Sequence, residues 1–274
     1  MLNNDFEKYI FKVGEQGFKR LEILNDICNP HSLKFLQDQR VLKPGIRVLE
    51  IGCGTGQMSS LIAKQITSSG QVDAIDINHE QLSLAKRHLN ENNIHNVNLY
   101  QLSAYELENT LCEKYDLIYS RLLLMHLKQP EKVLNSFKKI IKKNGAIISE
   151  DSEATSYECS PHSDVFDQWL KIRLPLFHFN INFGREASDL YKQCHYTDLT
   201  VHVNQPLLQL PEQRAFMRHA ILEHEKELVG KGKAFQNESE IKIFLENLIK
   251  LESDFHYTIK FMRMFQICVK GFSI

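Results

Sequence analysis

Short apolar runs alternate with amphipathic segments through the middle of the chain. The apolar runs, rich in β-branched and aromatic residues, lie at 47–51, 71–77, 97–102, 115–120 and 146–149. Between them apolar residues recur at helical spacing, for example at Met58, Leu61, Ile62 and Ile66. This alternation predicts an α/β fold with a parallel, doubly wound sheet and helices on both faces. Ligands of such sheets bind beyond the carboxyl ends of the strands.

The segments on either side of this region follow other patterns. Residues 1–40 have helical periodicity and are expected to form an N-terminal cap. Residues 152–183 are aromatic-rich and are predicted to form either a lid or the core of a subdomain. The remaining boundaries are a core over 41–205 that includes this insertion, a helical accessory segment over 206–255, and a final strand of the core sheet within 256–274.

Composition and charge narrow the class of protein. The chain has 274 residues, of which 43% are hydrophobic and 24% charged, with a net charge of −1. No global basic field attracts nucleic acid or an anionic membrane. The six cysteines lack CxxC or zinc-ligand spacing, so reduced thiols and no metal site are expected. No signal region or long apolar run is present, which favours the cytoplasm and no membrane partner. A monomer or homodimer is expected.

A glycine-rich loop, Glu50-Ile51-Gly52-Cys53-Gly54-Thr55-Gly56, follows the first predicted strand. Glycines allow a tight turn and close approach of a ligand, and the next helix presents free amides. A nucleoside triphosphate requires a Gly-Lys-Ser/Thr ending, and a dinucleotide requires a third glycine where Gln57 stands. A carboxylate at Glu50 suits a cationic ligand and repels a pyrophosphate. The loop therefore favours S-adenosylmethionine.

Asp76 ends the second predicted strand. A carboxylate at that place accepts hydrogen bonds from ribose hydroxyls, in a dinucleotide as in an adenosyl ligand. It therefore supports an adenosine-type cofactor without choosing between the two. An NAD(P)-dependent oxidoreductase on a similar sheet, and a non-catalytic S-adenosylmethionine-binding or interaction protein, remain the alternatives.

Several motifs resemble class I S-adenosylmethionine-dependent methyltransferases, particularly those acting on small molecules. They are VLEIGCGTGQMS, AIDIN with Gln81 after it, YDLIYSRLLLMHL, and the turn into IISED. The resemblance covers about 40–151 and extends weakly to the helices that carry Tyr9 and Arg20 and to 183–201. It implies a Rossmann-like methyltransferase fold of seven strands with N-terminal helices and a helical C-terminal insertion. The implied reaction transfers a methyl group to a small-molecule acceptor and leaves S-adenosylhomocysteine.

The resemblance also implies cofactor-binding positions after the first four strands. They are Glu50, Gly52, Cys53, Gly54, Gly56 and Gln57 for the methionine part, Asp76, Ile77 and Gln81 for the ribose and adenine, Ser103, Ala104 and Tyr105 for the adenine, and Ser120, Arg121 and Leu122 again for the methionine side. The family often has an acidic residue where Ser103 stands, so adenine recognition in this chain departs from the family pattern.

Residues that act on the acceptor are harder to assign. Methyl transfer is an in-line displacement, and a base is needed only if the acceptor loses a proton. His126, just past the fourth strand, is the candidate base, and a packing role fits it as well. Glu150 and Asp151 would either orient the acceptor or cap the next segment. Tyr9 and Arg20 close over the cofactor if the N-terminal helices fold onto it; an exposed position is the alternative for Arg20.

Overall fold

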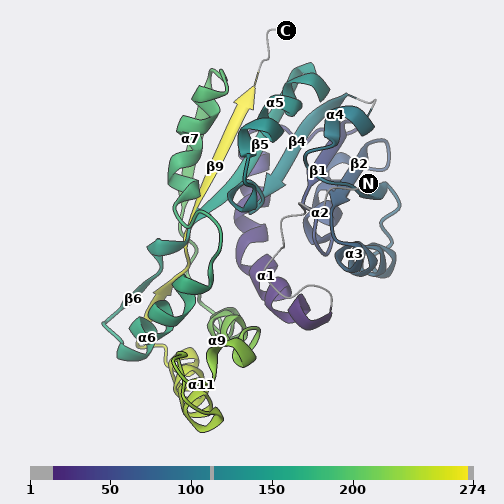
Figure 1. Cartoon of the computed structure of the whole chain (residues 1–274). Coiled ribbons are helices and arrows are strands. Elements are labelled where there is room, and N and C mark those ends of the chain that lie inside the picture. Colours follow the sequence, from purple (N-terminus) through teal and green to yellow (C-terminus); the bar gives the residue numbers. More distant parts are fainter. Residues whose placement is uncertain (1–14, 112–113, 271–274) are drawn as a thin grey trace, which may run out of the picture.

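A computed structural model describes residues 15–111 and 114–270 of the chain (Figure 1). Its main sheet has seven strands in the order β3-β2-β1-β4-β5-β9-β7. The strands are β1 (Arg47–Ile51), β2 (Gln71–Asp76), β3 (Val97–Gln101), β4 (Tyr115–Arg121), β5 (Ile141–Glu153), β7 (Leu199–Asn204) and β9 (Arg263–Lys270). Only the pairs that include β9 are antiparallel. The predicted doubly wound, mostly parallel sheet is therefore confirmed.

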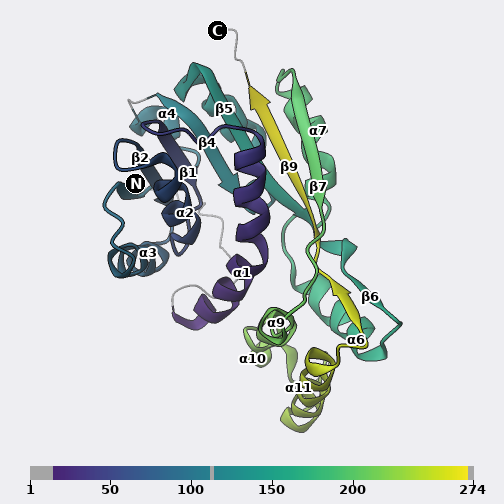
Figure 2. The same ribbon diagram turned by 180° about the vertical axis from the view of Figure 1, so that it is seen from behind.

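Helices cover both faces of the sheet, as Figures 1 and 2 show from opposite sides. One face carries α1 (Glu15–Asp38), α2 (Gln57–Ile66) and α3 (His79–Glu91). The other carries α4 (Leu107–Thr110), α5 (Pro130–Ile140) and α7 (Phe183–Gln193). Met58, Ile62 and Ile66 of the predicted helix are buried against the sheet. Within the described ranges, no helix is long and apolar enough to span a membrane.

β5 is longer than the sequence pattern predicts. The apolar run covers only 146–149, yet the strand continues to Glu153 because Ala146–Glu153 pairs residue by residue with β9. Glu150 and Asp151 were predicted to follow the strand, and they instead lie within it on alternate faces of the sheet. β5 ends at Glu153, which lies opposite Arg263 at the start of β9. The length of β5 therefore depends on a distant partner and could not be predicted from the local pattern.

A second core lies beside the sheet, where the two helical insertions meet. The aromatic insertion supplies α6 (Asp164–Arg173) and the 3-10 turn η3 (Leu174–Leu176). The accessory segment supplies α8 (Pro211–Arg214), α9 (Phe216–Leu222), α10 (Glu225–Leu228) and α11 (Glu238–Ser253). They pack around Trp169 and Phe261 together with apolar residues of α1, and a two-stranded sheet of β6 (Glu158–Ser160) and β8 (Thr258–Lys260) joins them. The aromatic insertion thus contributes a subdomain core.

Candidate functional site

The glycine loop between β1 and α2 is fastened to the end of β2. The amides of Gly52 and Cys53 donate to the carbonyl of Ile75 over 2.8 and 3.0 Å. The amide of Gly54 donates to the Asp76 carboxylate over 2.9 Å. The loop and the predicted ribose-binding carboxylate, which the sequence places far apart, therefore form one unit at the carboxyl edge of the sheet.

The glycines of the loop are required for different reasons. Gly52, Gly54 and Gly56 all have positive φ, at 74°, 53° and 74°, which L side chains rarely adopt. A Cβ at Gly56 would lie 2.9 Å from the Cβ of Ala85 on α3, so this glycine permits close packing. A Cβ at Gly54 would meet no described atom within 4 Å. Gly54 therefore faces open space, where a ligand can approach the backbone.

Glu50 is buried beneath the loop, next to α2. The Ser59 hydroxyl donates to its carboxylate. Burial raises the pKa of Glu50 to about 7, while that hydrogen bond and the charge of Arg121 oppose the rise. A carboxyl group with this pKa is partly protonated near neutral pH, and a cation placed beside it would favour ionisation.

Arg121 connects the end of β4 to α1. Its guanidinium donates to Asn25 over 2.7 Å and to Ser32 over 3.0 Å. Ser32 in turn donates to Glu150, whose carboxylate also accepts hydrogen bonds from Tyr119 and Gln266. Glu150 thus faces α1 and is held by three internal donors, which favours a structural role. The predicted contact between Arg121 and a cofactor remains a prediction, since both of these hydrogen-bond acceptors belong to α1.

Asp151 points to the opposite face of the sheet, beneath the turn that follows β4. Its side chain accepts a hydrogen bond from the amide of Met125 over 3.2 Å. That amide belongs to the 3-10 turn η1 (Leu124–His126), and Leu122 before it has a φ of 51° and donates to the Glu150 carbonyl. Burial raises the pKa of Asp151 to about 7. Asp151 therefore fixes the turn that carries His126.

Replacing Asp151 by asparagine is expected to flatten the pH dependence of stability. Since the folded pKa of about 7 exceeds the ordinary value of 3.8, the folded state holds the extra proton. Stability from this group is therefore present below pH 4 and is lost as pH rises to about 7. In Asp151→Asn, the slope of unfolding free energy against pH should weaken by up to ~1.4 kcal/mol per pH unit. Urea unfolding at pH 5, 6 and 7 measures this slope in both proteins. An unchanged slope would contradict the raised pKa of Asp151.

His126 is half-buried at the carboxyl edge of β4. Its ring packs against Phe179 in a T-shaped contact, with the ring centroids 4.4 Å apart. Burial, together with the nearby charge of Arg20, lowers the pKa of His126 to about 4. The imidazole is therefore neutral near pH 7 and presents a hydrogen-bond acceptor rather than a strong base.

Arg20 of α1 is buried and pairs with a carboxylate of the chain itself, so its predicted closing over the cofactor stays a prediction. That carboxylate is Glu223, directly after α9, whose two oxygens both lie 2.8 Å from the Arg20 Nε. The pair joins α1 to the second core, and its partner is the chain's own carboxylate. An exposed helix position, the alternative for Arg20, is wrong. Tyr9 lies outside the described residues.

Two residues predicted to lie near the adenine are more exposed to solvent than the residues of the glycine loop. Ile77, directly after β2, is 43% exposed although it is a large apolar residue. Tyr105 is also exposed, and its hydroxyl accepts a hydrogen bond from the Gln129 amide. The Ser103 hydroxyl accepts a hydrogen bond from the backbone amide of Tyr105. Ala104 packs against the core between the sheet and α4, α5 and α7. The backbone amide of Gln81 donates to the side chain of Asn78, which caps α3.

Three buried polar atoms near the loop lack hydrogen-bond partners among the described residues. They are Thr55 Oγ1, Gln81 Oε1 and Ser120 Oγ. Such atoms are costly unless a ligand or water satisfies them. Together with Asp76 and the open space at Gly54, they fit a polar ligand such as S-adenosylmethionine. Thr55 was not singled out from the sequence, although its place between two glycines of the loop is a signal for it.

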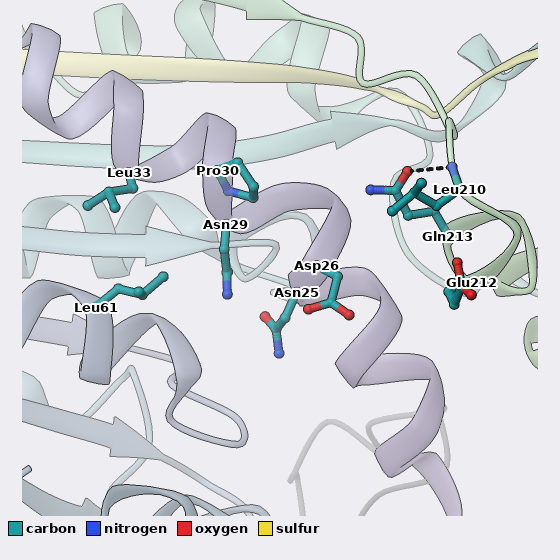
Figure 3. A pocket seen from close by; sticks show the side chains of 9 residues that line it. All are labelled: Asn25, Asp26, Asn29, Pro30, Leu33, Leu61, Leu210, Glu212 and Gln213. Atoms are coloured by element: carbon teal, nitrogen blue, oxygen red, sulfur yellow. Dashed lines mark hydrogen bonds between the residues drawn. The ribbon is translucent and has the colours of Figure 1, made fainter. Parts of the chain in front are cut away.

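A pocket of about 540 Å³ lies on the outer side of α1 (Figure 3). It runs from Leu61 on α2, which is half-buried against the core, to residues at the start of α8. Of the predicted cofactor residues that the structure describes, none lines it. Asn25 connects it to the site, because Asn25 lines the pocket and accepts the hydrogen bond from Arg121. Within the described ranges, no group of three metal-ligating side chains occurs.

Comparison with known proteins gives a family and a fold. The family model described as "Methyltransferase domain" matches residues 42–214. A ubiquinone biosynthesis O-methyltransferase of Coxiella burnetii is 30% identical over 122 residues, which cover 44% of this chain and 50% of that protein. The chain thus matches about half the length of such curated relatives.

Solved structures share the fold at low sequence identity. The YcgJ protein of Bacillus subtilis has a TM-score of 0.57 at 14% identity, and the match covers 89% of this chain and 99% of that one. Phosphoethanolamine N-methyltransferase 2 of Haemonchus contortus, solved with phosphomonomethylethanolamine and S-adenosylhomocysteine, has a TM-score of 0.51 at 16% identity, covering 93% of this chain and 53% of that one. Both matches concern the arrangement of strands and helices.

Proposed function

Because this chain belongs to the methyltransferase domain family, as a class I S-adenosylmethionine-dependent methyltransferase, we propose that it methylates a small-molecule acceptor by in-line displacement. The observation that carries this proposal is the unit formed by the glycine loop and Asp76. Its amide-to-carboxylate bond of 2.9 Å shapes a loop whose middle glycine faces open space. S-adenosylmethionine supplies a methyl group on a sulfonium, which is reactive without metal or redox chemistry.

Several residues of the chain would hold this cofactor. Asp76 would accept hydrogen bonds from the ribose, and Ile77 would cover the adenine. Ser120 and Gln81 offer buried polar atoms that have no partner in the described chain. Glu50 would face the cationic methionine end through the loop. The remaining predicted contacts, at 103–105 and at Arg121, belong to the same proposal.

The acceptor is proposed to bind beside His126. A lone pair of the acceptor oxygen or nitrogen would form the new bond to the methyl carbon as the carbon–sulfur bond breaks. The electron pair of that bond would pass to the sulfur, which leaves S-adenosylhomocysteine, and the acceptor's proton would leave to solvent. His126, neutral because its pKa is lowered to about 4, would accept a hydrogen bond from the acceptor and orient it. The rate should therefore show no inflection from His126 between pH 6 and 8.

Cofactor binding is expected to release a proton from Glu50. Its pKa of about 7 reflects burial, and a cationic ligand would lower that pKa by favouring the ionised form. Affinity should therefore rise as pH increases through about 7. Calorimetry in buffers of different ionisation enthalpy measures the proton count. Glu50→Gln should abolish the release, and an equal release from the variant would show that another group titrates.

The direct test is a methyl-transfer screen with the purified chain. S-adenosylhomocysteine release is measured with a library of phenols and alkylamines, since the two similar methyltransferases are named for O- and N-methylation. Binding of NAD(P)H without any affinity for S-adenosylmethionine would favour the oxidoreductase instead. A cytoplasmic monomer or homodimer is part of the proposal; fractionation and light scattering test it. The balanced charge and the free thiols of the five described cysteines agree with it.

A further inference from the structure

The second core meets the core between the sheet and α4, α5 and α7, which we call the central core, in a seam at the carboxyl edge of β4. Leu122, directly after β4, packs against both cores. The segment between η3 and α7 crosses the same seam, because Phe177 packs against the second core and Phe179 against the central one. Ligand sites favour such junctions between packed units. The seam also adjoins the turn that carries His126.

Four side chains form a continuous chain of T-shaped, tilted and cation–π contacts across this seam, which we call the aromatic ladder. The His126 and Phe179 centroids are 4.4 Å apart, and those of Phe179 and Phe177 are 4.7 Å apart. The Arg173 guanidinium carbon lies 4.5 Å from the Phe177 centroid. These separations are typical of favourable aromatic and cation–π contacts. The ladder therefore runs from the predicted transfer site on β4 to α6.

We propose that the aromatic ladder is the acceptor-binding face and that the acceptor carries a planar aromatic ring, which stacks on Phe179 beside His126. This inference rests on the proposed function and narrows its substrate class. The rings of the ladder differ from those of the adjacent core. Phe166 and Trp169 are buried, whereas Phe177, Phe179 and His126 each keep part of their surface exposed.

The charge state of the ladder also suits an aromatic acceptor. His126 is neutral near pH 7, so its end of the ladder offers a π-face and a hydrogen-bond acceptor rather than a cation. A phenol or arylamine could stack on Phe179 while its hydroxyl or amine donates to His126. A saturated acceptor of the same size could make the hydrogen bond but would lose the stacking. Stacked aromatic pairs contribute about 0.5–1.5 kcal/mol beyond burial.

The test uses matched probes, catechol against cis-1,2-cyclohexanediol and aniline against cyclohexylamine. Binding is measured by calorimetry with S-adenosylhomocysteine present, so that turnover is not needed, and kcat and KM are measured where methylation occurs. Catechol or aniline should bind roughly tenfold more tightly than its saturated partner. Phe179→Leu should remove that preference while leaving cofactor affinity unchanged, and Phe179→Tyr should restore it.

Phe255→Ala is the matched control, because it removes a phenyl ring that lies after α11, is 61% exposed and belongs to no part of the aromatic ladder. It should leave both the ring preference and the KM unchanged. Equal affinity for aromatic and saturated probes, or a preference that survives Phe179→Leu, would overturn the proposal. Failure to bind S-adenosylmethionine would instead overturn the proposed function, so the two failures are distinct.

Discussion

Gly54→Val should reduce affinity for S-adenosylmethionine by at least ~100-fold, or about 2.7 kcal/mol, while the chain stays folded. The valine side chain would occupy the space in front of the loop, where no described atom lies within 4 Å of the Cβ position. A β-branched residue at φ 53° also strains the backbone, by about 1–2 kcal/mol for the left-handed conformation. Calorimetric titration gives the affinity, and circular dichroism with thermal unfolding verifies the fold.

Gly56→Ala provides the contrasting variant within the same loop. Its Cβ would lie 2.9 Å from the Cβ and 3.2 Å from the Cα of Ala85, so α2 and α3 would have to separate. Its main effect should be lower thermal stability, as overpacking typically costs about 1–3 kcal/mol. If Gly54→Val bound the cofactor normally, the loop would not be the cofactor site, whatever happened at Gly56.

Asp76→Ala should weaken cofactor binding about 30-fold, or ~2 kcal/mol, for two reasons. The variant loses the proposed acceptor of the ribose hydroxyls, and it frees the Gly54 amide from the carboxylate that shapes the loop. Burial raises the pKa of Asp76, and the amides of Asn78 and Gly54 partly oppose that rise. Affinity of the wild-type chain should therefore begin to fall, on acidification, above the ordinary aspartate range.

Asn78→Ala is the matched control for Asp76→Ala. Asn78, two residues after Asp76, caps α3 through its side chain, and its backbone amide, which donates to Asp76, is kept in the variant. Loss of such a cap costs about 1 kcal/mol of stability. Its cofactor affinity should stay within a factor of two to three of wild type, and a loss as large as that of Asp76→Ala would mean that the helix, not the carboxylate, matters.

The loop and the five parallel strands around it were predictable because their signals are local. A strand of β-branched residues, a turn and an amphipathic helix can each be predicted from a segment of about ten residues. The link between Gly54 and Asp76 follows from the same signals, since the carboxyl ends of neighbouring parallel strands meet at one edge.

Partners supplied from distant parts of the chain were not predictable. Nothing in the helix around Ser32 indicates that it meets Arg121 and Glu150, and nothing near Arg20 points to Glu223. The extension of β5 to Glu153 depends on β9, more than a hundred residues later. These contacts depend on tertiary packing, so they could not be predicted from local patterns in a single sequence.

The position of β9 in the sheet constrains how the chain can fold during translation. β9 (Arg263–Lys270) lies between β5 and β7, so β7 has no neighbour in the sheet until β9 is in place. While the ribosome is still synthesising residues up to 262, both the β5 edge and the strand at 199–204 expose unpaired backbone. Nascent chains at that stage should recruit holdase chaperones, and native β7 should form only after residue 270 leaves the exit tunnel.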